Sequence, residues 1–279
     1  MDRKISIPRV TLEKLYYQDG LSQREIASRL GCSESTVRRR LAEYGLPASR
    51  GDRAGFLQRR GEHNWRCFWS PEVAYAVGLI VSDGSLSTDG RHITFTSSDL
   101  ELVETFCRCL RLPNRITETP ISSRSVRTGY RVQFSDVVFY RWLLDIGLMP
   151  DKARRLGPLN VPDEYFADFL RGYLDGDGNI HTYVDRYNTF KNKKYVYRRL
   201  FVRFTSTSRE YLNWLRHTLT RLLGTRGGLG GGGNRTWVLI YAKKDSLRLL
   251  RWMYYDADVP CLERKHAIAA PFLKEQPEM

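Results

Sequence analysis

One nine-residue pattern occurs twice in this chain of 279 residues. The first copy, Ala76–Gly84, reads AVGLIVSDG and the second, Leu170–Gly178, reads LRGYLDGDG, so each ends an apolar segment in Asp-Gly. An apolar segment of this kind predicts a buried helix. An Asp in the last turn lies against the partial negative charge of the helix dipole, where a cation is favoured. The repeat therefore predicts two equivalent helices whose acidic ends, Asp83 and Asp177, need a cation opposite them.

Each of these helices carries a glycine at the same place, Gly78 in the first and Gly172 in the second. A residue without a Cβ lets two backbones approach closely, so the two helices are expected to pack on each other. Gly84 and Gly178 follow the last helical residues, where a positive φ is common. Both are therefore expected to end their helices in the left-handed conformation.

The segments after the two copies also match. Each copy is followed by the alternating pattern of a β-hairpin, a helical pattern, a second hairpin and a last helix. The expected ranges are 85–96 and 179–204 for the first hairpins, 100–110 and 210–223 for the helices, 115–135 and 225–242 for the second hairpins, with last helices ending at Arg141-Trp142 and Arg251-Trp252. The order predicts an α+β fold with two pseudo-symmetric αββαββα halves, at 70–160 and 161–279.

The charge of the chain favours nucleic acid as a partner. Lys and Arg number 45 against 31 Asp and Glu, which gives a formal net charge of +14. Such an excess is typical of proteins that bind a phosphate backbone, whereas no apolar run approaches the ~20 residues that span a bilayer. The five cysteines have no zinc-ligand spacing, and the start of the chain has no signal-peptide pattern. Reduced thiols, a cytoplasmic location and no membrane association are expected.

The first 46 residues predict a small all-α domain with three short helices, near 11–18, 22–30 and 33–44. Ser22 and Ser33 are suitable N-caps, Glu25 completes a capping box, and Gly31 suits a turn with positive φ. This arrangement resembles the helix-turn-helix of recombinases and phage-type regulators, in which the last helix reads DNA. A three-helix protein–protein module with a solvated Arg face is the alternative. The candidate DNA-reading residues are Ser33, Ser35, Thr36, Arg38, Arg39 and Arg40.

Residues 47–69 form an Arg/Gly-rich segment that predicts a linker between the small domain and the two halves. Arg50 and Arg53 are candidates for contacts with phosphates or the minor groove. An inert tether fits the composition equally well. A second glycine-rich stretch, 227–233, lacks the Gly-Lys-Ser/Thr ending of a phosphate-binding loop. It is interpreted as a mobile turn, and no nucleotide cofactor is expected.

The two motif copies, each at the head of the same pattern of elements over about residues 65 to 275, resemble the single-chain LAGLIDADG homing endonucleases. The resemblance implies a monomer with internal pseudo-twofold symmetry, central motif helices and a saddle of strands that lies on double-stranded DNA. It also implies hydrolysis of both DNA strands with Mg²⁺, or Mn²⁺, held by the last motif Asp of each copy. In this chain these residues are Asp83 and Asp177, and we place Ser82 and Gly176 in the same metal site.

Other residues near the motif are assigned partly by position and partly by resemblance. Asp175 and Asp177 point to opposite sides of a regular helix at 100° per residue, so Asp175 is expected to be a cap or interface residue; Val81 replaces it in the first copy. Lys152 and Lys265 hold matching places downstream, and the resemblance makes them candidates for activating water or stabilising the charged transition state. An ordinary phosphate-contacting or surface role is the alternative for each lysine.

The hairpins are expected to read DNA with alternate residues, because side chains of a strand point to opposite faces in turn. Thr96 and Thr205 are included because relatives often place a polar residue there. The candidates are Arg91, Thr96, Arg124, Arg127, Arg131, Arg186, Lys191, Lys193, Lys194, Arg198, Arg203 and Thr205.

Three other functions compete with a nuclease. A transcription regulator with a LAGLIDADG-like body that no longer cleaves DNA would keep the same helix-turn-helix. The presence of both Asp83 and Asp177, and of both lysines, Lys152 and Lys265, argues against loss of cleavage. A maturase that binds intron RNA is disfavoured, because an A-form helix hides its major groove from a recognition helix. An intein is not expected, because neither end of the chain has splicing-type residues.

Overall fold

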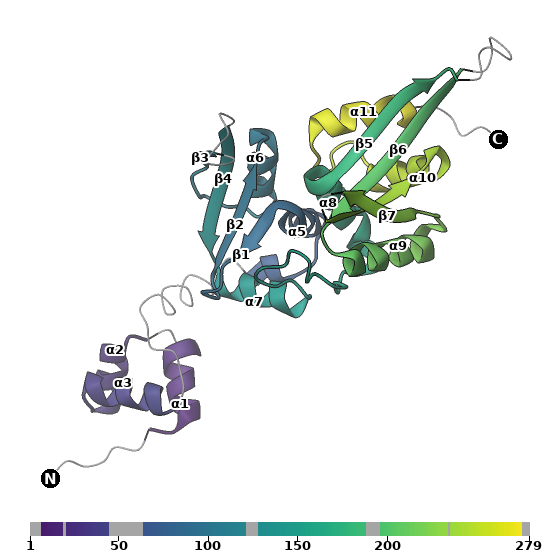
Figure 1. Cartoon of the computed structure of the whole chain (residues 1–279). Coiled ribbons are helices and arrows are strands. Elements are labelled where there is room, and N and C mark those ends of the chain that lie inside the picture. Colours follow the sequence, from purple (N-terminus) through teal and green to yellow (C-terminus); the bar gives the residue numbers. More distant parts are fainter. Residues whose placement is uncertain are drawn as a thin grey trace. The chain divides into compact units, whose positions relative to one another are not determined.

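The structure is a computed structural model that describes residues 7–18, 21–44, 64–120, 128–187, 196–233 and 235–274 (Figure 1). The chain divides into two units. One contains the described residues up to Cys67 together with Ser135–Phe139, and the other contains Phe68–Phe134 and the described residues from Tyr140 onward. The predicted linker therefore lies largely outside the described residues, as do Arg50 and Arg53.

The first unit contains the predicted small helical domain. Its elements are α1 (Arg9–Glu13), the π-helical turn η1 (Lys14–Gln18), α2 (Gln23–Leu30), α3 (Glu34–Glu43) and the 3₁₀ turn η2 (Asn64–Cys67). A cluster of fully buried side chains, including Leu12, Ile26, Val37 and Leu41, joins the three helices. The Tyr44 hydroxyl donates a 2.7 Å hydrogen bond to the Ile7 carbonyl, which ties the end of α3 to the segment before α1.

The predicted caps of this domain are confirmed. The Ser22 Oγ accepts from the Glu25 amide at 2.9 Å, while the Glu25 carboxylate accepts from the Ser22 amide at 2.5 Å, so both halves of the capping box are present. Gly31 has a φ of 64° and ends α2 in the left-handed conformation. Ser33 then caps α3, because its Oγ accepts from the Thr36 amide at 3.3 Å.

Replacing Ser22 with Ala is expected to destabilise α2 by about 1 kcal/mol, because the Glu25 amide loses its acceptor. Amide hydrogen exchange of Glu25 in the full chain should accelerate about fivefold. Ser28→Ala is the control, since Ser28 is an exposed residue of the same helix. Equal exchange rates in the two variants would contradict the role of the cap.

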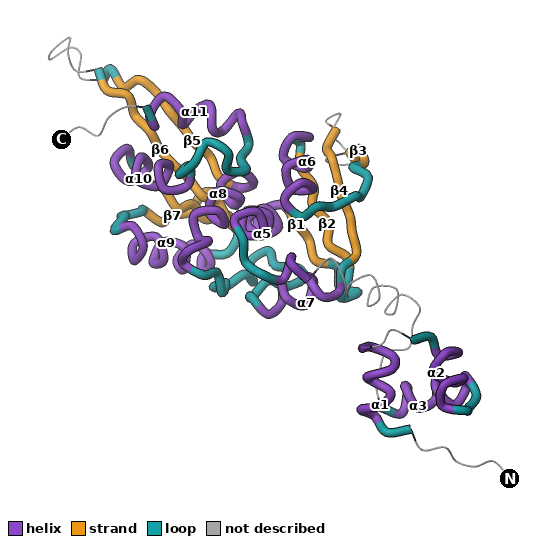
Figure 2. Tube along the Cα trace, turned by 180° about the vertical axis from the view of Figure 1, so that it is seen from behind, coloured by secondary structure: helices purple, strands orange, loops and turns teal. Residues whose placement is uncertain are grey.

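From α5 onward the chain contains two halves with the same order of elements (Figure 2). The first half has α5 (Pro71–Asp83), β1 (Gly84–Leu86), β2 (His92–Ser97), α6 (Leu100–Cys109), β3 (Thr117–Pro120), β4 (Thr128–Ser135) and α7 (Val137–Asp145). The second half has η3 (Asp163–Tyr165), α8 (Phe166–Asp177), β5 (Gly178–Asp185), β6 (Tyr197–Ser206), α9 (Arg209–Leu223), β7 (Gly228–Gly233), β8 (Thr236–Tyr241), α10 (Lys243–Met253) and α11 (Glu263–Leu273).

Each half forms a four-stranded antiparallel sheet, and the strand order is the same in both: β1-β2-β4-β3 and β5-β6-β8-β7. The predicted α+β fold with two αββαββα halves is therefore confirmed, and α11 is an addition to the predicted pattern. The interpretation of residues 227–233 as a mobile turn is wrong for most of that stretch. Gly228–Gly233 is β7, which pairs with β8 through backbone hydrogen bonds that need no side chain.

The two motif helices, α5 and α8, pack on each other at the centre of the second unit (Figure 1). A Cβ on Gly78 would lie 2.2 Å from the Phe169 carbonyl oxygen, and a Cβ on Gly172 would lie 2.1 Å from the Tyr75 carbonyl oxygen. Each glycine thus faces the backbone of the opposite helix, at a distance that no side chain allows. The predicted close approach of the two helices is confirmed.

Helices cover one face of each sheet, and α9 and α10 pack on the second sheet (Figure 2). In β6 the residues Leu200, Val202 and Phe204 are fully buried on the covered side, while Phe201 and Arg203 alternate with them. None of the five cysteines, all of which are described, forms a disulfide. Among the described helices, none combines the length and the apolar character that a membrane span requires.

Candidate functional site

The two motif helices end directly in strands. Gly84 begins β1 with a φ of −84°, and Gly178 begins β5 with a φ of −93°, so the predicted left-handed conformation of both residues is wrong. Glycine is required at both positions for another reason. A Cβ would lie 2.6 Å from the Cα atom of Ile80 in the first half and of Leu174 in the second. The chain turns back so tightly from helix to strand that a side chain would clash with the preceding helical turn.

The last residues of α5 and α8 meet at a seam between the helices. Asp83 and Asp177 are both exposed there, each one residue before the glycine that begins a strand. Gly176 lies directly against the neighbouring helix, because a Cβ on it would be 1.8 Å from the Ser82 Oγ and 3.0 Å from the Asp83 Oδ2. The structure thus brings together the four residues that the sequence assigned to a metal site.

The two carboxylates influence each other's environment. Desolvation by the surrounding protein raises the pKa of Asp83 to about 6, and the Asp177 carboxylate adds to this increase. Desolvation also raises the pKa of Asp177. Lys152 and Lys265 oppose the increase at both residues. The seam therefore concentrates negative charge that a cation would stabilise.

Lys265 is almost completely buried, at 5% exposure, and its ammonium lies under the end of α8. The three N–H groups of the Nζ are shared among four carbonyl acceptors, those of Leu174 (2.7 Å), Asp175 (2.8 Å), Gly176 (3.3 Å) and Gly178 (2.7 Å). The last carbonyls of a helix have no partner within the helix, and a cation there also stabilises the helix dipole. Lys265 thus supplies the cation that an acidic helix end requires.

Lys152 holds the matching place in the first half. Its Nζ donates to the carbonyl of Ser82 at 3.3 Å and to that of Gly84. Burial lowers the pKa of Lys152, while Asp177 and Asp83 raise it. Both lysines therefore contact the backbone of the motif helices, and activation of water by either of them stays a prediction.

The donor set at the seam suits Mg²⁺. This ion binds oxygen atoms and usually takes one or two protein carboxylates, with water and substrate phosphates completing its shell. Asp83 and Asp177 supply two exposed carboxylates. The described residues contain no group of three or more His, Cys, Asp or Glu that could hold a metal. The carbonyls of Ser82 and Gly176 already accept from lysines, so the two carboxylates are the main ligands available to a metal.

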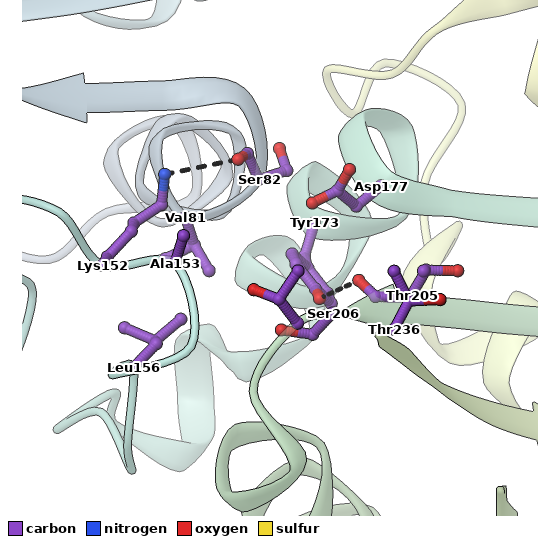
Figure 3. A pocket seen from close by; sticks show the side chains of 11 residues that line it. Val81, Ser82, Lys152, Ala153, Leu156, Tyr173, Asp177, Thr205, Ser206 and Thr236 are labelled. Carbon is purple, nitrogen blue, oxygen red and sulfur yellow. Dashed lines mark hydrogen bonds between the residues drawn. The ribbon is translucent and has the colours of Figure 1, made fainter. Parts of the chain in front are cut away.

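A pocket of about 270 Å³ opens beside Asp177 (Figure 3). Ser82 and Lys152 line it from the first half, and a set of hydroxyl groups lines it from the second. The Tyr173 hydroxyl donates to the Thr205 carbonyl at 2.6 Å at the base of this set. The hydroxyl-bearing residues of the pocket are Ser82, Tyr173, Thr205, Ser206, Thr207 and Thr236.

Asp175 does not share the site of Asp177. It is buried at 1% exposure, and its Oδ2 accepts from the Tyr75 hydroxyl and from the Leu262 amide, both at 2.8 Å. Tyr75 belongs to α5, so Asp175 links the two motif helices. The prediction that Asp175 is an interface residue is confirmed, and the geometric reason is the helical rotation that separates it from Asp177.

The predicted DNA-reading residues of the hairpins lie in different settings. Arg203 and Thr205 share the uncovered side of β6, opposite the buried residues. Arg198 has the other parity, and its guanidinium lies 4.5 Å from the centre of the Phe272 ring in α11. Its placement therefore does not fit the predicted role, whereas Arg199, which sequence reasoning missed, is on the uncovered side. Counting in steps of two from Leu200 would have separated the two arginines.

In the first half, Thr96 and Arg131 lie in β2 and β4, and Arg131 donates to the Gln133 side chain at 2.6 Å. Arg91 lies in the turn before β2 and pairs with Asp89 at 3.5 Å. Arg186 is exposed just after β5. The remaining candidates in the hairpins lie outside the described residues: Arg124, Arg127, Lys191, Lys193 and Lys194.

In the small helical domain, Arg38 and Arg39 are exposed on α3, and Arg40 is half-buried and pairs with Glu43. Ser33 has a structural role as a cap, and its Oγ also lies 2.8 Å from the Ser35 hydroxyl and 2.9 Å from that of Thr36. Arg38 and Arg39 thus give one surface of α3 an exposed positive charge that a polyanion could contact.

Comparison with known proteins gives two family matches. The model of "Sigma-70, region 4" matches residues 14–43, and that of the "LAGLIDADG-like domain" matches residues 164–251. A curated relative, one of the subunits of the A-type ATP synthase of Methanopyrus kandleri, is 31% identical over 111 residues. That match covers 39% of this chain, and the chain spans about a tenth of the length of the relative.

Among solved structures, the I-LtrWI LAGLIDADG homing endonuclease bound to target DNA is similar to 73% of this chain and to 89% of its own, with a TM-score of 0.51 and 12% identity. Full-length DUF199/WhiA from Thermatoga maritima is 18% identical, with a TM-score of 0.46; 74% of this chain and 62% of that one are covered. Together with the two four-stranded sheets and the paired motif helices, the two family matches and the I-LtrWI structure show that the chain has the LAGLIDADG fold, with a helix-turn-helix in its N-terminal part.

Proposed function

We propose that this chain is a site-specific DNA endonuclease of the homing type, which hydrolyses both strands of a duplex with Mg²⁺ or Mn²⁺. The observation that carries the proposal is the meeting of two exposed carboxylates, Asp83 and Asp177, at the ends of the paired helices. Two neighbouring carboxylates whose pKa values are raised lower the stability of the fold when both are ionised, so they have no structural benefit. Functional sites, in contrast, concentrate such groups.

In this proposal Asp83 and Asp177 would hold the ion, which would supply an activated water and stabilise the charge on the phosphate. Lys152 and Lys265 fix the helix ends that carry the two carboxylates. The hydroxyl groups that line the pocket beside Asp177 would offer hydrogen bonds to water there. The protein acts as a monomer with internal pseudo-twofold symmetry, as the matching order of elements in its halves supports.

The sheets and the helix-turn-helix would grip the DNA on either side of the cleavage point. A net charge of +14 supports a polyanionic partner, and the exposed Arg38 and Arg39 suit phosphate or base contacts. The I-LtrWI structure, of the same fold, is bound to its target DNA. Double-stranded DNA inside the cell is therefore the partner that we propose.

The decisive experiment compares cleavage by the full chain with cleavage by Asp83→Asn and Asp177→Asn on a randomised duplex library with Mg²⁺. We expect site-selective double-strand cuts from the unmodified chain. Each substitution removes a metal ligand and should lower the cleavage rate on the order of a thousandfold, with binding retained. Asp145→Asn is the matched control, because Asp145 is an exposed Asp at the end of α7 and not of a motif helix.

A DNA-binding regulator that does not cleave is the second candidate, and one observation favours it. The acidic helix ends already have cations, because the ammonium groups of Lys152 and Lys265 lie on the carbonyls of the same helical turns. A metal is then not needed to stabilise the fold. Selective binding with no cleavage by the unmodified chain, with either Mg²⁺ or Mn²⁺, would establish the regulator and exclude the nuclease.

A further inference from the structure

The uncovered faces of the two sheets have different chemistry, although the strand order is the same. In the first half, the uncovered positions of β2 and β3 are His92, Thr94, Thr96, Thr117 and Thr119. In the second half, the register places Phe201 where His92 stands, because Gly84 pairs with Phe95 and Gly178 pairs with Phe204. A polar face in one half thus corresponds to a partly apolar face in the other.

The apolar side chains of the second face are adjacent. The rings of Tyr183 and Phe201 stack with centroids 6.2 Å apart and planes within 10°. Ile240 pairs with Arg203 and Val238 pairs with Thr205, so both lie on the same face as Phe201. Phe201, Val238 and Ile240 are only partly buried. The helices of this half lie on the opposite face, so these contacts leave apolar surface open to a partner.

β7 leaves this surface accessible. Gly228 pairs with Ile240 and Gly230 pairs with Val238, so the neighbouring strand adds no side chain beside either apolar residue. A Cβ on Gly230 would meet nothing within 4 Å. Packing within the protein therefore does not require glycine at Gly230. Because Gly230 has no side chain, β7 does not cover the neighbouring apolar residues on this face.

Arginines accompany the apolar residues. Arg203 lies with its guanidinium 5.9 Å from the centre of the Phe201 ring, and its Nε is buried without a partner among the described residues. Arg199 pairs with Asp185 at 2.8 Å on the same side of the strand. Cationic groups beside an apolar strip match a partner whose phosphates flank an apolar group.

We propose that the second sheet recognises the C5-methyl groups of thymines in its half of the DNA site, through Phe201, Val238 and Ile240. This inference rests on the proposed DNA binding. The major groove admits a two-stranded ribbon, and the thymine methyl is the apolar group that the bases present there. The threonine-rich face of the first half reads its half of the site with hydrogen bonds instead. The two half-sites differ in composition, and thymines are enriched in the one that the second sheet contacts.

The test removes the methyl groups alone. The full chain is used to select a bound site from a randomised duplex library in Ca²⁺, and the thymines of each half-site are then replaced in turn with deoxyuridine. In the half contacted by the second sheet, each contacted methyl that is lost should weaken Kd about fourfold, which is the effect of exposing one buried methyl group. The same replacement in the other half should leave Kd unchanged.

The variant Phe201→His assigns the half-sites, because it introduces the residue that the first half has at the matching position. Selection repeated with this variant should relax the base preference of one half only, and that half should lose part of its sensitivity to deoxyuridine. Phe68→Ser is the control, since Phe68 is 69% exposed and lies outside both sheets. It should leave selection and sensitivity unchanged.

The possible failures are distinguishable. Selective binding that deoxyuridine does not weaken in either half overturns the methyl recognition while leaving the proposed DNA binding intact. A selected site without thymine in the half that Phe201→His relaxes, or no relaxation at all, also overturns it. Absence of any selective binding by the unmodified chain overturns both this inference and the proposed function.

Discussion

Gly172→Ala is expected to destabilise the chain by about 3 kcal/mol, the upper range for overpacking a close contact. The new methyl group would lie 2.1 Å from the Tyr75 carbonyl oxygen, and backbone atoms cannot move aside without separating α5 from α8. Without this contact, a Gly→Ala substitution inside a helix would instead raise the free energy of unfolding by up to about 1 kcal/mol. The free energy of unfolding from urea denaturation measures the effect.

Gly78→Ala should behave in the same way, because its Cβ would lie 2.2 Å from the Phe169 carbonyl oxygen. The control is Gly231→Ala, since a Cβ there meets nothing within 4 Å and its φ is not positive. This control should change the free energy of unfolding by no more than about 0.5 kcal/mol. Stabilisation by Gly172→Ala would show that the two motif helices do not pack as described.

Lys265→Met is expected to cost about 3 to 5 kcal/mol of unfolding free energy. Methionine keeps much of the apolar stem, but it removes the ammonium that donates to four backbone carbonyls beneath the end of α8. Those carbonyls are screened from water, because the Lys265 side chain is 5% exposed. Urea denaturation of the full chain measures the loss, and circular dichroism reports whether the remaining structure is native.

The neighbouring Arg264→Met provides the comparison for this experiment. Arg264 also carries a positive charge on α11, but it pairs with Asp99 at 2.7 Å on the surface, with its side chain 57% exposed. An exposed ion pair contributes about 0 to 1 kcal/mol. If Lys265→Met lowered the free energy of unfolding no more than Arg264→Met, the contacts of Lys265 with the helix end would not stabilise the fold. A purely chemical role of Lys265 would then be favoured.

The parts of the fold that could be predicted from sequence are those fixed by local rules. The Ser22 and Ser33 caps follow from hydrogen bonds over three residues. The pairing of the motif helices follows from Gly78 and Gly172 at matching places in two apolar segments. The order of helices and strands along the chain, the same in both halves, follows from the repeat and from the family resemblance, and the structure confirms it.

The errors arose where tertiary contacts decide the local conformation. A glycine after a helix suggests a positive φ, but Gly84 and Gly178 are extended because a strand begins at once and the preceding turn leaves no room for a Cβ. Seven residues with six glycines carry no alternation of polar and apolar side chains, so the sequence predicts a turn where the structure has β7. Pairing with β8 supplies the order that side chains do not.

The candidate site was predictable in its carboxylates but not in the orientation of its lysines. Asp83 and Asp177 occupy equivalent positions, so the pairing of the helices brings them together. Nothing in the spacing of Lys152 indicates that its ammonium contacts the carbonyls of Ser82 and Gly84. That contact depends on the path of the segment after α7, which carries no periodic pattern. The metal role of Asp83 and Asp177 stays a prediction.

The fit of Ser82 against Gly176 has an evolutionary consequence. One helix contributes a hydroxymethyl group and the other only a bare α-carbon, with 1.8 Å between the serine oxygen and the place that a Cβ would occupy. Two copies of the first half would place one serine against another, and the two side chains would clash. Two copies of the second half would place glycine against glycine and leave a void. If the two halves arose by duplication of an ancestral gene, they have since diverged at this contact. Each half now fits the other half and no longer fits a second copy of itself.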